Sequence, residues 1–211
     1  MTSVLYITYD GLCDPLGQSQ VISYIKELSR KGVHTVILNF EKKERLKEEG
    51  LFRAIKSGLS QEKVTWKYLR YHNNPRVLAT VYDILSGVLK GISLIKKHKI
   101  GIVHARGYVP AFIAFWLKRL GKIKFIFDMR GFWVEEKVDA GFWKKESFGY
   151  KIAKSWEKMI LNVADRVVVL TQKAKAFLTS NADKVQNDVS VIPTCVDLDI
   201  FRPIDTAKKI S

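Results

Sequence analysis

Charged and aromatic side chains follow one apolar stretch in the middle of the chain, and they are the residues best suited to chemistry. Residues 123–137 read IKFIFDMRGFWVEEK, so an apolar run stops abruptly at Asp128 and Arg130. Two aromatic residues, Phe132 and Trp133, and two carboxylates follow. Aromatic faces beside carboxylates and a guanidinium suit a polar, ring-shaped ligand such as a sugar. The alternative is that Asp128 and Arg130 pair with each other and cap the next helix.

The position of these residues in the predicted sheet supports the first interpretation. Residues 123–128 read as a buried strand, and in open α/β sheets ligands bind at the carboxyl ends of the strands. His104 and Arg106 end the preceding strand, VHARG, which we expect beside Asp128. A lone histidine is more often structural, so both roles stay open for His104. The candidate catalytic residues are Asp128 and Arg130, and the candidate substrate-binding residues here are His104, Arg106, Trp133, Glu135 and Glu136.

The first loop of the chain, residues 10–18, is the usual phosphate site of such folds, but it lacks both common fingerprints. Gly11 and Gly17 are six residues apart and no lysine follows. Gly17 and Gln18 can still present backbone N–H groups to an anion at a helix start. The alternative is a flexible turn capped by Ser19. No set of His, Cys and acidic residues has metal-ligand spacing, so we expect no metal and no cofactor.

The elements around these residues alternate in the order that builds a parallel sheet. We expect an α/β, Rossmann-like, doubly wound, mostly parallel sheet of about seven strands. Between Gly131 and Phe148 we expect an irregular excursion, and over residues 43–56 a single helix. A long helix after Pro75 carries glycines that allow close packing, Gly87 and Gly91. Its predicted buried stripe consists of Val77, Val81, Ile84, Val88, Ile92 and Ile95.

Composition limits the class of protein and its partners. The chain has 211 residues, with 36 Lys and Arg against 21 Asp and Glu, a net charge of +15. Such an excess attracts anions, whether nucleic acid, an anionic lipid surface or a phosphorylated small molecule. The two cysteines are far apart, which indicates a reducing compartment. No signal peptide and no run of about 18 apolar residues are recognised, so we expect a cytoplasmic protein.

Basic and aromatic residues alternate over one further segment, residues 142–158. Such a mixture is typical of a membrane surface or of nucleic-acid binding. The alternative is an ordinary amphipathic helix with a lysine-rich outer face. We expect Phe142 to Lys158 to contact an anionic membrane, with the protein peripheral at the inner face.

The end of the chain resembles a known signature. Residues 191–203 read VIPTCVDLDIFRP, which is similar to the "IPNGVD…F.P" stretch that closes the N-terminal domain of family 4 glycosyltransferases of the GT-B fold. Cys195 stands where that family has glycine. The opening strand, the loop through Gly17, the KGVHTV stretch at residues 31–36 and the VHARG and VVVLT strands also fit. The resemblance covers nearly the whole chain.

This resemblance implies an acceptor-binding half of a retaining, hexosyltransferase-like glycosyltransferase that uses a nucleotide sugar without a metal ion. Polysaccharide or lipid-linked glycan synthesis is the implied setting, with a sugar or lipid-linked glycan as acceptor. Many members carry a histidine–aspartate pair after the corresponding strand, whereas this chain reads Asp128-Met129-Arg130 without a histidine, and Arg130 is expected to contact donor phosphate or acceptor instead. We expect one domain over residues 1–203, a linker or tail over 204–211, a missing C-terminal donor domain, and no activity of this chain alone. The alternative is a stand-alone basic Rossmann-like module for nucleic acid or anionic lipid, with nucleic acid the less expected partner.

Overall fold

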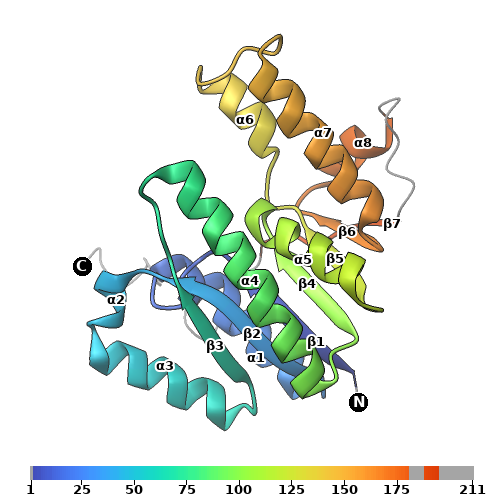
Figure 1. The fold of residues 1–211 in the computed structure, drawn as a ribbon. Helices are drawn as coiled ribbons and strands as arrows, with labels where there is room; N and C mark the ends of the chain where they lie inside the picture. The colour runs from blue at the N-terminus through green and yellow to red at the C-terminus, as the bar shows by residue number, and fades with distance from the viewer. Residues whose placement is uncertain (1, 181–187, 195–211) are drawn as a thin grey trace, which may run out of the picture.

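The computed structural model describes residues 2–180 and 188–194 and contains one sheet of seven parallel strands (Figure 1). The strand order is β3-β2-β1-β4-β5-β6-β7, so the chain starts near the middle of the sheet and winds outward in both directions. The predicted doubly wound fold is therefore confirmed. Residues 195–203 of the predicted signature and the expected boundary after residue 203 lie outside the described residues. The strands are β1 (Ser3–Thr8), β2 (His34–Glu41), β3 (Thr65–Arg70), β4 (Ile102–Arg106), β5 (Lys124–Asp128), β6 (Arg166–Val169) and β7 (Asp188–Val191).

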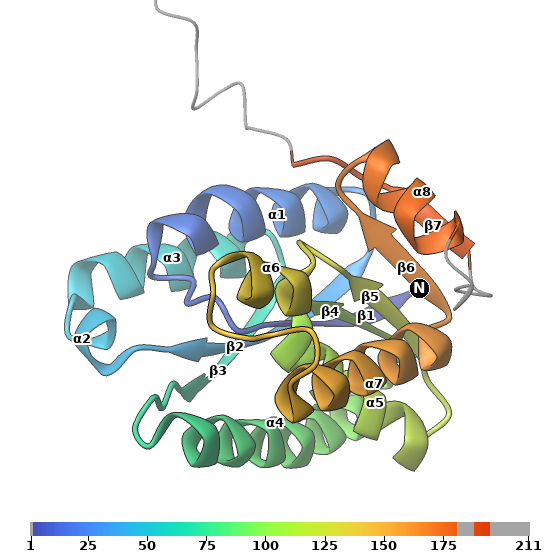
Figure 2. The same ribbon diagram turned by 90° about the horizontal axis from the view of Figure 1, so that it is seen from above.

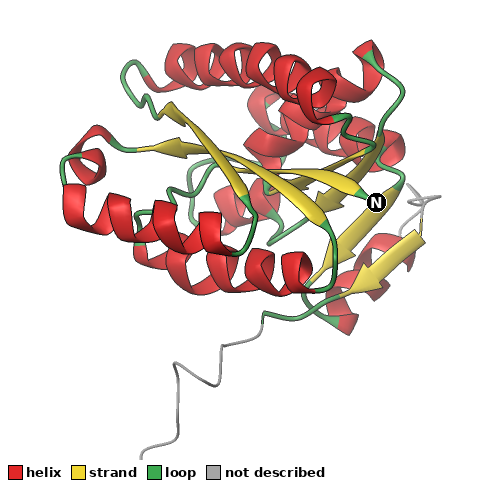
Figure 3. Cartoon of the chain, turned by 90° about the horizontal axis from the view of Figure 1, so that it is seen from below, coloured by secondary structure: helices red, strands yellow, loops and turns green. Residues whose placement is uncertain are grey.

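Helices cover both faces of the sheet. Figure 2 shows α1, α3 and α8 on one side and α4, α5 and α7 on the other. Figure 3 shows the sheet enclosed between helices from below. The helical elements are the π-helical turn η1 (Gly17–Ile22), α1 (Ser23–Arg30), α2 (Lys43–Leu46), α3 (Glu49–Gln61), α4 (Arg76–His98), α5 (Tyr108–Leu120), α6 (Trp133–Asp139), α7 (Phe148–Val163) and α8 (Gln172–Ser180).

The central strands are buried on both faces, and their side chains alternate between two cores. Leu5 and Ile7 of β1 belong to the larger cluster, whereas Tyr6 belongs to the smaller one. The larger cluster includes Ile113 of α5, and the smaller one includes Ile25 of α1. This period of two is the geometry of a strand, and burial on both faces explains why the strands read as continuous apolar runs.

Two sequence expectations about helices are wrong. Residues 43–56 form two helices, because Glu48 has a ψ of 68° that breaks the helical path between α2 and α3. The stretch from Gly131 to Phe148 is not wholly irregular, since it contains α6. With seven residues, α6 is too short to display a clear hydrophobic period. The expected helix over residues 19–31 is present as η1 followed by α1.

The buried stripe expected on α4 is confirmed for four of its six residues, since Val88 is buried and Ile84, Ile92 and Ile95 pack against the larger core cluster. Val77 and Val81 are exposed, while the buried residues are Ala79, Asp83, Gly87, Val88, Gly91 and Leu94. Among the described residues, α4 is the one helix whose length and composition would allow it to cross a membrane. No such run was expected from the sequence. Here α4 packs against α5 and carries a fully buried carboxylate, so it lies along the sheet as part of the fold.

Candidate functional site

The ends of β4 and β5 bring the first two candidate residues together. Strand register places Arg106 directly beside Asp128, both at the carboxyl edge of the sheet. Both side chains are buried, Arg106 with 6% and Asp128 with 5% of its surface exposed. The chain leaves β4 through Gly107, whose φ of +82° favours glycine and whose N–H donates to the Asp128 carbonyl at 2.9 Å. A buried pair of opposite charges therefore lies at the carboxyl ends of β4 and β5.

Arg106 is held by three groups from different parts of the chain. Its Nε donates to Asp10 Oδ2 at 3.2 Å, and its Nη2 donates to Gln20 Oε1 at 2.5 Å. Its Nη1 lies 3.9 Å from Asp128 Oδ2, an ion-pair distance without a hydrogen bond. The first loop and η1 are therefore tied to the end of β4.

Arg130 completes the group from the loop after β5. Its Nη1 lies 3.5 Å from Asp128 Oδ1, and its Nη2 donates to Thr194 Oγ1 at 2.6 Å. A longer hydrogen bond of 3.4 Å joins Nη2 to Gln20 Oε1. Gln20 therefore accepts from both guanidiniums and fixes their spacing. Unlike Arg106, Arg130 is only half-buried, so its remaining donors are within reach of a ligand.

His104 lies behind the carboxylate, with its Nε2 3.8 Å from Asp128 Oδ2 and its ring against Tyr6 at 4.7 Å between centroids. Burial alone would raise the pKa of Asp128. His104 and the guanidiniums of Arg130 and Arg106 act in the opposite direction, and the net result is a pKa below the ordinary value. Asp128 is therefore an ionised acceptor at neutral pH.

Two polar atoms of this cluster are left incompletely bonded. Within the described part of the chain, Asp128 Oδ1 and His104 Nε2 are buried and have no hydrogen-bond partner. Buried polar groups are nearly always bonded, and the exceptions call for an explanation. We name Asp10, Gln20, His104, Arg106, Asp128 and Arg130 the Asp128 cluster. It offers a carboxylate acceptor and guanidinium donors, the groups that bind sugar hydroxyls and phosphates.

The first loop supports the cluster, and of the residues predicted within it Gly17 is buried and Gln18 is half-buried. A Cβ on Gly17 would lie 2.0 Å from the Gly11 carbonyl oxygen, so backbone already fills that space. Gln18 donates through Nε2 to the Cys13 carbonyl at 3.2 Å. The loop is anchored by buried Glu41, whose Oε1 accepts from Leu12 N at 2.6 Å. Gly17 and Gln18 therefore shape the loop beneath the cluster.

The remaining predicted residues form a separate group on α6. Trp133 packs between Tyr108 and Trp143, at 5.8 and 5.3 Å between ring centroids. Glu135 pairs with Lys154 Nζ at 2.9 Å, so its charge is engaged by α7. Glu136 is exposed. No described contact joins these three residues to the Asp128 cluster.

Three members of the site escaped sequence reasoning: Asp10, Gln20 and Thr194. Asp10 lies two residues after β1, as Asp128 ends β5, so its position at the carboxyl edge was a usable signal. Gln20 lies on η1, and its orientation depends on the π-helical turn. Thr194 comes after β7, and only the sheet order brings it near Arg130.

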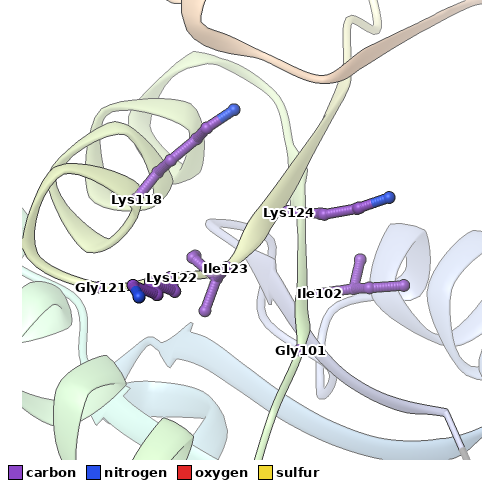
Figure 4. A pocket seen from close by; sticks show the side chains of 7 residues that line it. All are labelled: Gly101, Ile102, Lys118, Gly121, Lys122, Ile123 and Lys124. Carbon is purple, nitrogen blue, oxygen red and sulfur yellow. The ribbon is translucent and has the colours of Figure 1, made fainter.

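A pocket of about 660 Å³ lies at the opposite, amino edge of β4 and β5 (Figure 4). It is lined by Gly101 and Ile102 at the start of β4, by Lys118 of α5, and by residues 121–124, which run from the end of α5 to the start of β5. Lys118 is already paired with Asp165 at 2.6 Å. Ligands of open α/β sheets bind at the carboxyl edge, so we place the site at the Asp128 cluster. Among the described residues, no group of His, Cys, Asp or Glu is arranged to hold a metal ion.

A comparison with protein families matches residues 17–200 to the model described as Glycosyltransferase Family 4. The chain belongs to glycosyltransferase family 4. The match covers most of the chain. It includes every residue of the Asp128 cluster except Asp10, which lies before residue 17 together with β1. A search of curated proteins found no match.

Solved structures agree on the fold of this family 4 chain. It is similar to a glycosyltransferase from Rickettsia africae ESF-5, with 18% identity and a TM-score of 0.62, over 99% of this chain and 47% of that one. It is similar to sucrose-phosphate synthase from Thermosynechococcus elongatus, with 14% identity and a TM-score of 0.65, over 99% and 52%. It is also similar to a structure titled S. aureus MnaA-UDP co-structure, with 14% identity and a TM-score of 0.59, over 99% of this chain and 50% of that one. The chain thus has the fold of one half of a GT-B protein and spans about half the length of these structures.

Proposed function

We propose that this chain is the acceptor-binding half of a retaining glycosyltransferase that uses a nucleotide-sugar donor. The observation that carries the proposal is the buried, ionised Asp128, which keeps one unbonded carboxylate oxygen between two guanidiniums at the carboxyl edge of a family 4 domain. Polysaccharide or lipid-linked glycan synthesis is the setting, and the transferred sugar is a hexose.

In this proposal each residue of the cluster has a role toward the substrate. Asp128 Oδ1 accepts a hydrogen bond from an acceptor hydroxyl and holds it in position. Arg130 directs its free donors to the acceptor or to a donor phosphate, and supplies positive charge where negative charge develops. That charge makes a metal ion unnecessary. Trp133 and the glutamates of α6 border the acceptor farther out.

A second domain supplies the nucleotide-sugar site in this proposal. Its support is that the chain spans about half the length of the structures it resembles. The chain alone would then be inactive. The working enzyme is cytoplasmic and associates with the inner face of a membrane through residues 142–158. The support for this contact is that Phe142 and Phe148 are exposed beside the exposed Lys144 and Lys145.

Binding measurements on this chain test the proposal directly. Saturation-transfer NMR with a panel of glycans should show contact with the acceptor sugar, reduced in Asp128→Asn and Arg130→Ala. Lys31→Ala, an exposed change at the end of α1, is the matched control. Calorimetric titration with uridine and guanosine diphosphate sugars should show weak binding at most. Micromolar nucleotide binding by this chain alone would place the donor site within it and overturn the acceptor assignment.

A further inference from the structure

The helix α4 has two unlike faces, and two glycines lie on the face that meets the core. A Cβ on Gly87 would lie 2.5 Å from Ile113 Cδ1, and a Cβ on Gly91 would lie 2.8 Å from Leu117 Cδ1. Close packing on α5 therefore requires glycine at both positions. Val88 and Leu94 are buried on the same face, and a second row of large apolar residues lies on the other side of the helix.

That other side is an exposed apolar stripe. We name it the α4 outer stripe, and its residues are Val77, Leu78, Val81, Tyr82, Leu85 and Leu89, with 48% to 74% of each exposed. Their spacings of three and four residues place them in one continuous row along the helix. Single exposed apolar residues are ordinary, but a contiguous patch marks an interaction surface.

The charges of α4 indicate which surface the stripe meets. The helix has one carboxylate, Asp83, and it is fully buried. The other charged residues are basic: Arg76 at the start, Lys90 in the middle, and Lys96 and Lys97 near the end. An apolar face bordered only by cations is the pattern of a helix that lies flat in the interface of an anionic bilayer.

A basic pocket of about 330 Å³ lies beside the first turn of α4, at the carboxyl ends of β2 and β3. Its lining includes Lys42, Lys43, Arg70 and His72, with Glu44 as its carboxylate. Lys42 pairs with Asp14 at 2.9 Å. Lys43 and Arg70 have no carboxylate within ion-pair distance in the part of the chain that the structure describes. The pocket therefore carries an excess of positive charge that an anion can balance.

A buried carboxylate fixes the histidine of this pocket. Asp83 Oδ1 lies 2.7 Å from His72 Nδ1, and Asp83 Oδ2 accepts from the His72 backbone N–H at 3.1 Å and from Tyr9 Oη at 2.8 Å. Asp83 therefore engages Nδ1 and not Nε2 of His72, and Nε2 donates to an anion when both ring nitrogens carry a proton. The His72 ring also packs edge-on against Tyr82 at 5.1 Å, and Tyr82 belongs to the α4 outer stripe. The pocket and the stripe therefore adjoin.

We propose that the α4 outer stripe lies on an anionic lipid bilayer and that the adjoining pocket binds the phosphate of a lipid. The phosphate meets Lys43, Arg70 and His72, and the hydrocarbon chain runs along Tyr82 and the rest of the stripe. A lipid with a phosphate group contacts the basic pocket and the α4 outer stripe at once. A soluble phosphate would contact the pocket alone, and a neutral lipid would contact the stripe alone.

This inference rests on the proposed function where it names the acceptor. The pocket lies at the same edge as the Asp128 cluster, and β3 and β5 are four strands apart, roughly 19 Å at the usual strand spacing. A lipid-linked glycan bound by its phosphate in the pocket would reach the cluster with a distal sugar. Membrane and phosphate binding can be measured without any sugar transfer, so their failure and that of the proposed function are distinguishable.

Vesicle sedimentation with the 211-residue chain tests the proposal. Neutral phosphatidylcholine vesicles are compared with vesicles that also contain phosphatidic acid, in low salt. The stripe variant is Leu85→Ser with Leu89→Ser, and the pocket variant is Lys43→Ala with Arg70→Ala. The control is Lys31→Ala with Lys56→Ala, which removes the same charge from exposed positions on α1 and α3, across the sheet from α4 (Figure 2). Circular dichroism verifies that each variant is folded.

Wild type should bind the phosphatidic acid vesicles. The pocket variant should bind about 25-fold more weakly, since each basic side chain at an anionic surface contributes about fivefold. The stripe variant should lose at least tenfold. The control, which has the same net charge as the pocket variant, should lose less than fivefold. Equal losses in control and pocket variants, or no vesicle binding at all, would overturn the proposal. If glycerol phosphate abolishes vesicle binding and the stripe variant binds vesicles as well as wild type does, the pocket binds a soluble phosphate and the proposed membrane contact is wrong.

Discussion

Arg106→Ala should destabilise the fold strongly although the change lies at the edge of the sheet. The guanidinium is 6% exposed and bonds to Asp10 and Gln20, with Asp128 at ion-pair distance. Removing one partner of a buried ion pair costs about 3–5 kcal/mol. Asp10 is partly exposed and can be rehydrated, and Arg130 still faces Asp128. We therefore expect the lower end, a loss of about 3 kcal/mol at pH 7.

The loss should depend on pH because Asp128 has a pKa below its ordinary value in the folded state. Such a carboxylate stabilises the fold above its unfolded pKa of about 3.9, and this contribution disappears as pH falls through the folded pKa. Arg106 supplies part of that depression. The difference in unfolding free energy between wild type and Arg106→Ala should therefore be largest at pH 6–7, roughly 3 kcal/mol, and should narrow in acid.

Urea unfolding followed by tryptophan fluorescence measures both quantities, provided that the transition is cooperative. A matched control is Arg166→Ala, whose exposed pair with Asp188 should contribute little. Asp128→Asn in the Arg106→Ala background should recover part of the loss, because the uncompensated charge is removed. A loss below about 1 kcal/mol for Arg106→Ala, or a loss that does not change between pH 7 and pH 3, would refute the reasoning that the cluster is a buried charge network.

Three further predictions concern the elements around the site and the proposed chemistry. Gly91→Leu should destabilise by about 1–3 kcal/mol in urea titrations, because even a Cβ there would meet Leu117. Tyr108→Phe should cost about 1–2 kcal/mol, since its hydroxyl donates at 2.6 Å to the buried carboxylate of Glu157; an unchanged midpoint would mean that water replaces the hydroxyl. In a complete enzyme, Arg130→Ala should lower turnover roughly 100-fold and Arg130→Lys should restore it only in part, measured by sugar-transfer assay; full activity of the alanine variant would give Arg130 a structural role.

Much of the fold could be predicted because its strands are buried on both faces. Continuous apolar runs such as FIF at residues 125–127 identify the strands, and their alternation with helices gives a parallel sheet. The break between α2 and α3 could not be predicted, because the two residues at it are Lys47 and Glu48, both good helix formers, and the nearby Gly50 lies inside α3. The inner face of α4 was predicted in part. The two glycines and the stripe from Ile84 to Ile95 do face the core, whereas Val77 and Val81 at the start of the helix are exposed.

The site was predicted in part for a similar reason. Asp128 and Arg106 each end a strand, and parallel strands bring their carboxyl ends to one edge, so their meeting follows from the fold class. Gln20 could not be found in this way, because its bonds to two guanidiniums depend on the π-helical turn. His72 had no apparent context in the sequence, since its partner Asp83 is eleven residues away on the buried side of the next helix.

The geometry of Asp128 favours a site over the simple pairing of Asp128 with Arg130. A structural pair would be expected to saturate the carboxylate, commonly with two parallel hydrogen bonds from one guanidinium. Here the two guanidiniums stand 3.5 and 3.9 Å away and bond instead to Thr194, Gln20 and Asp10. The carboxylate stays ionised and buried, and Oδ1 lacks a partner among the described residues. Leaving such an atom unbonded costs free energy, and a ligand hydroxyl placed at this edge would recover it.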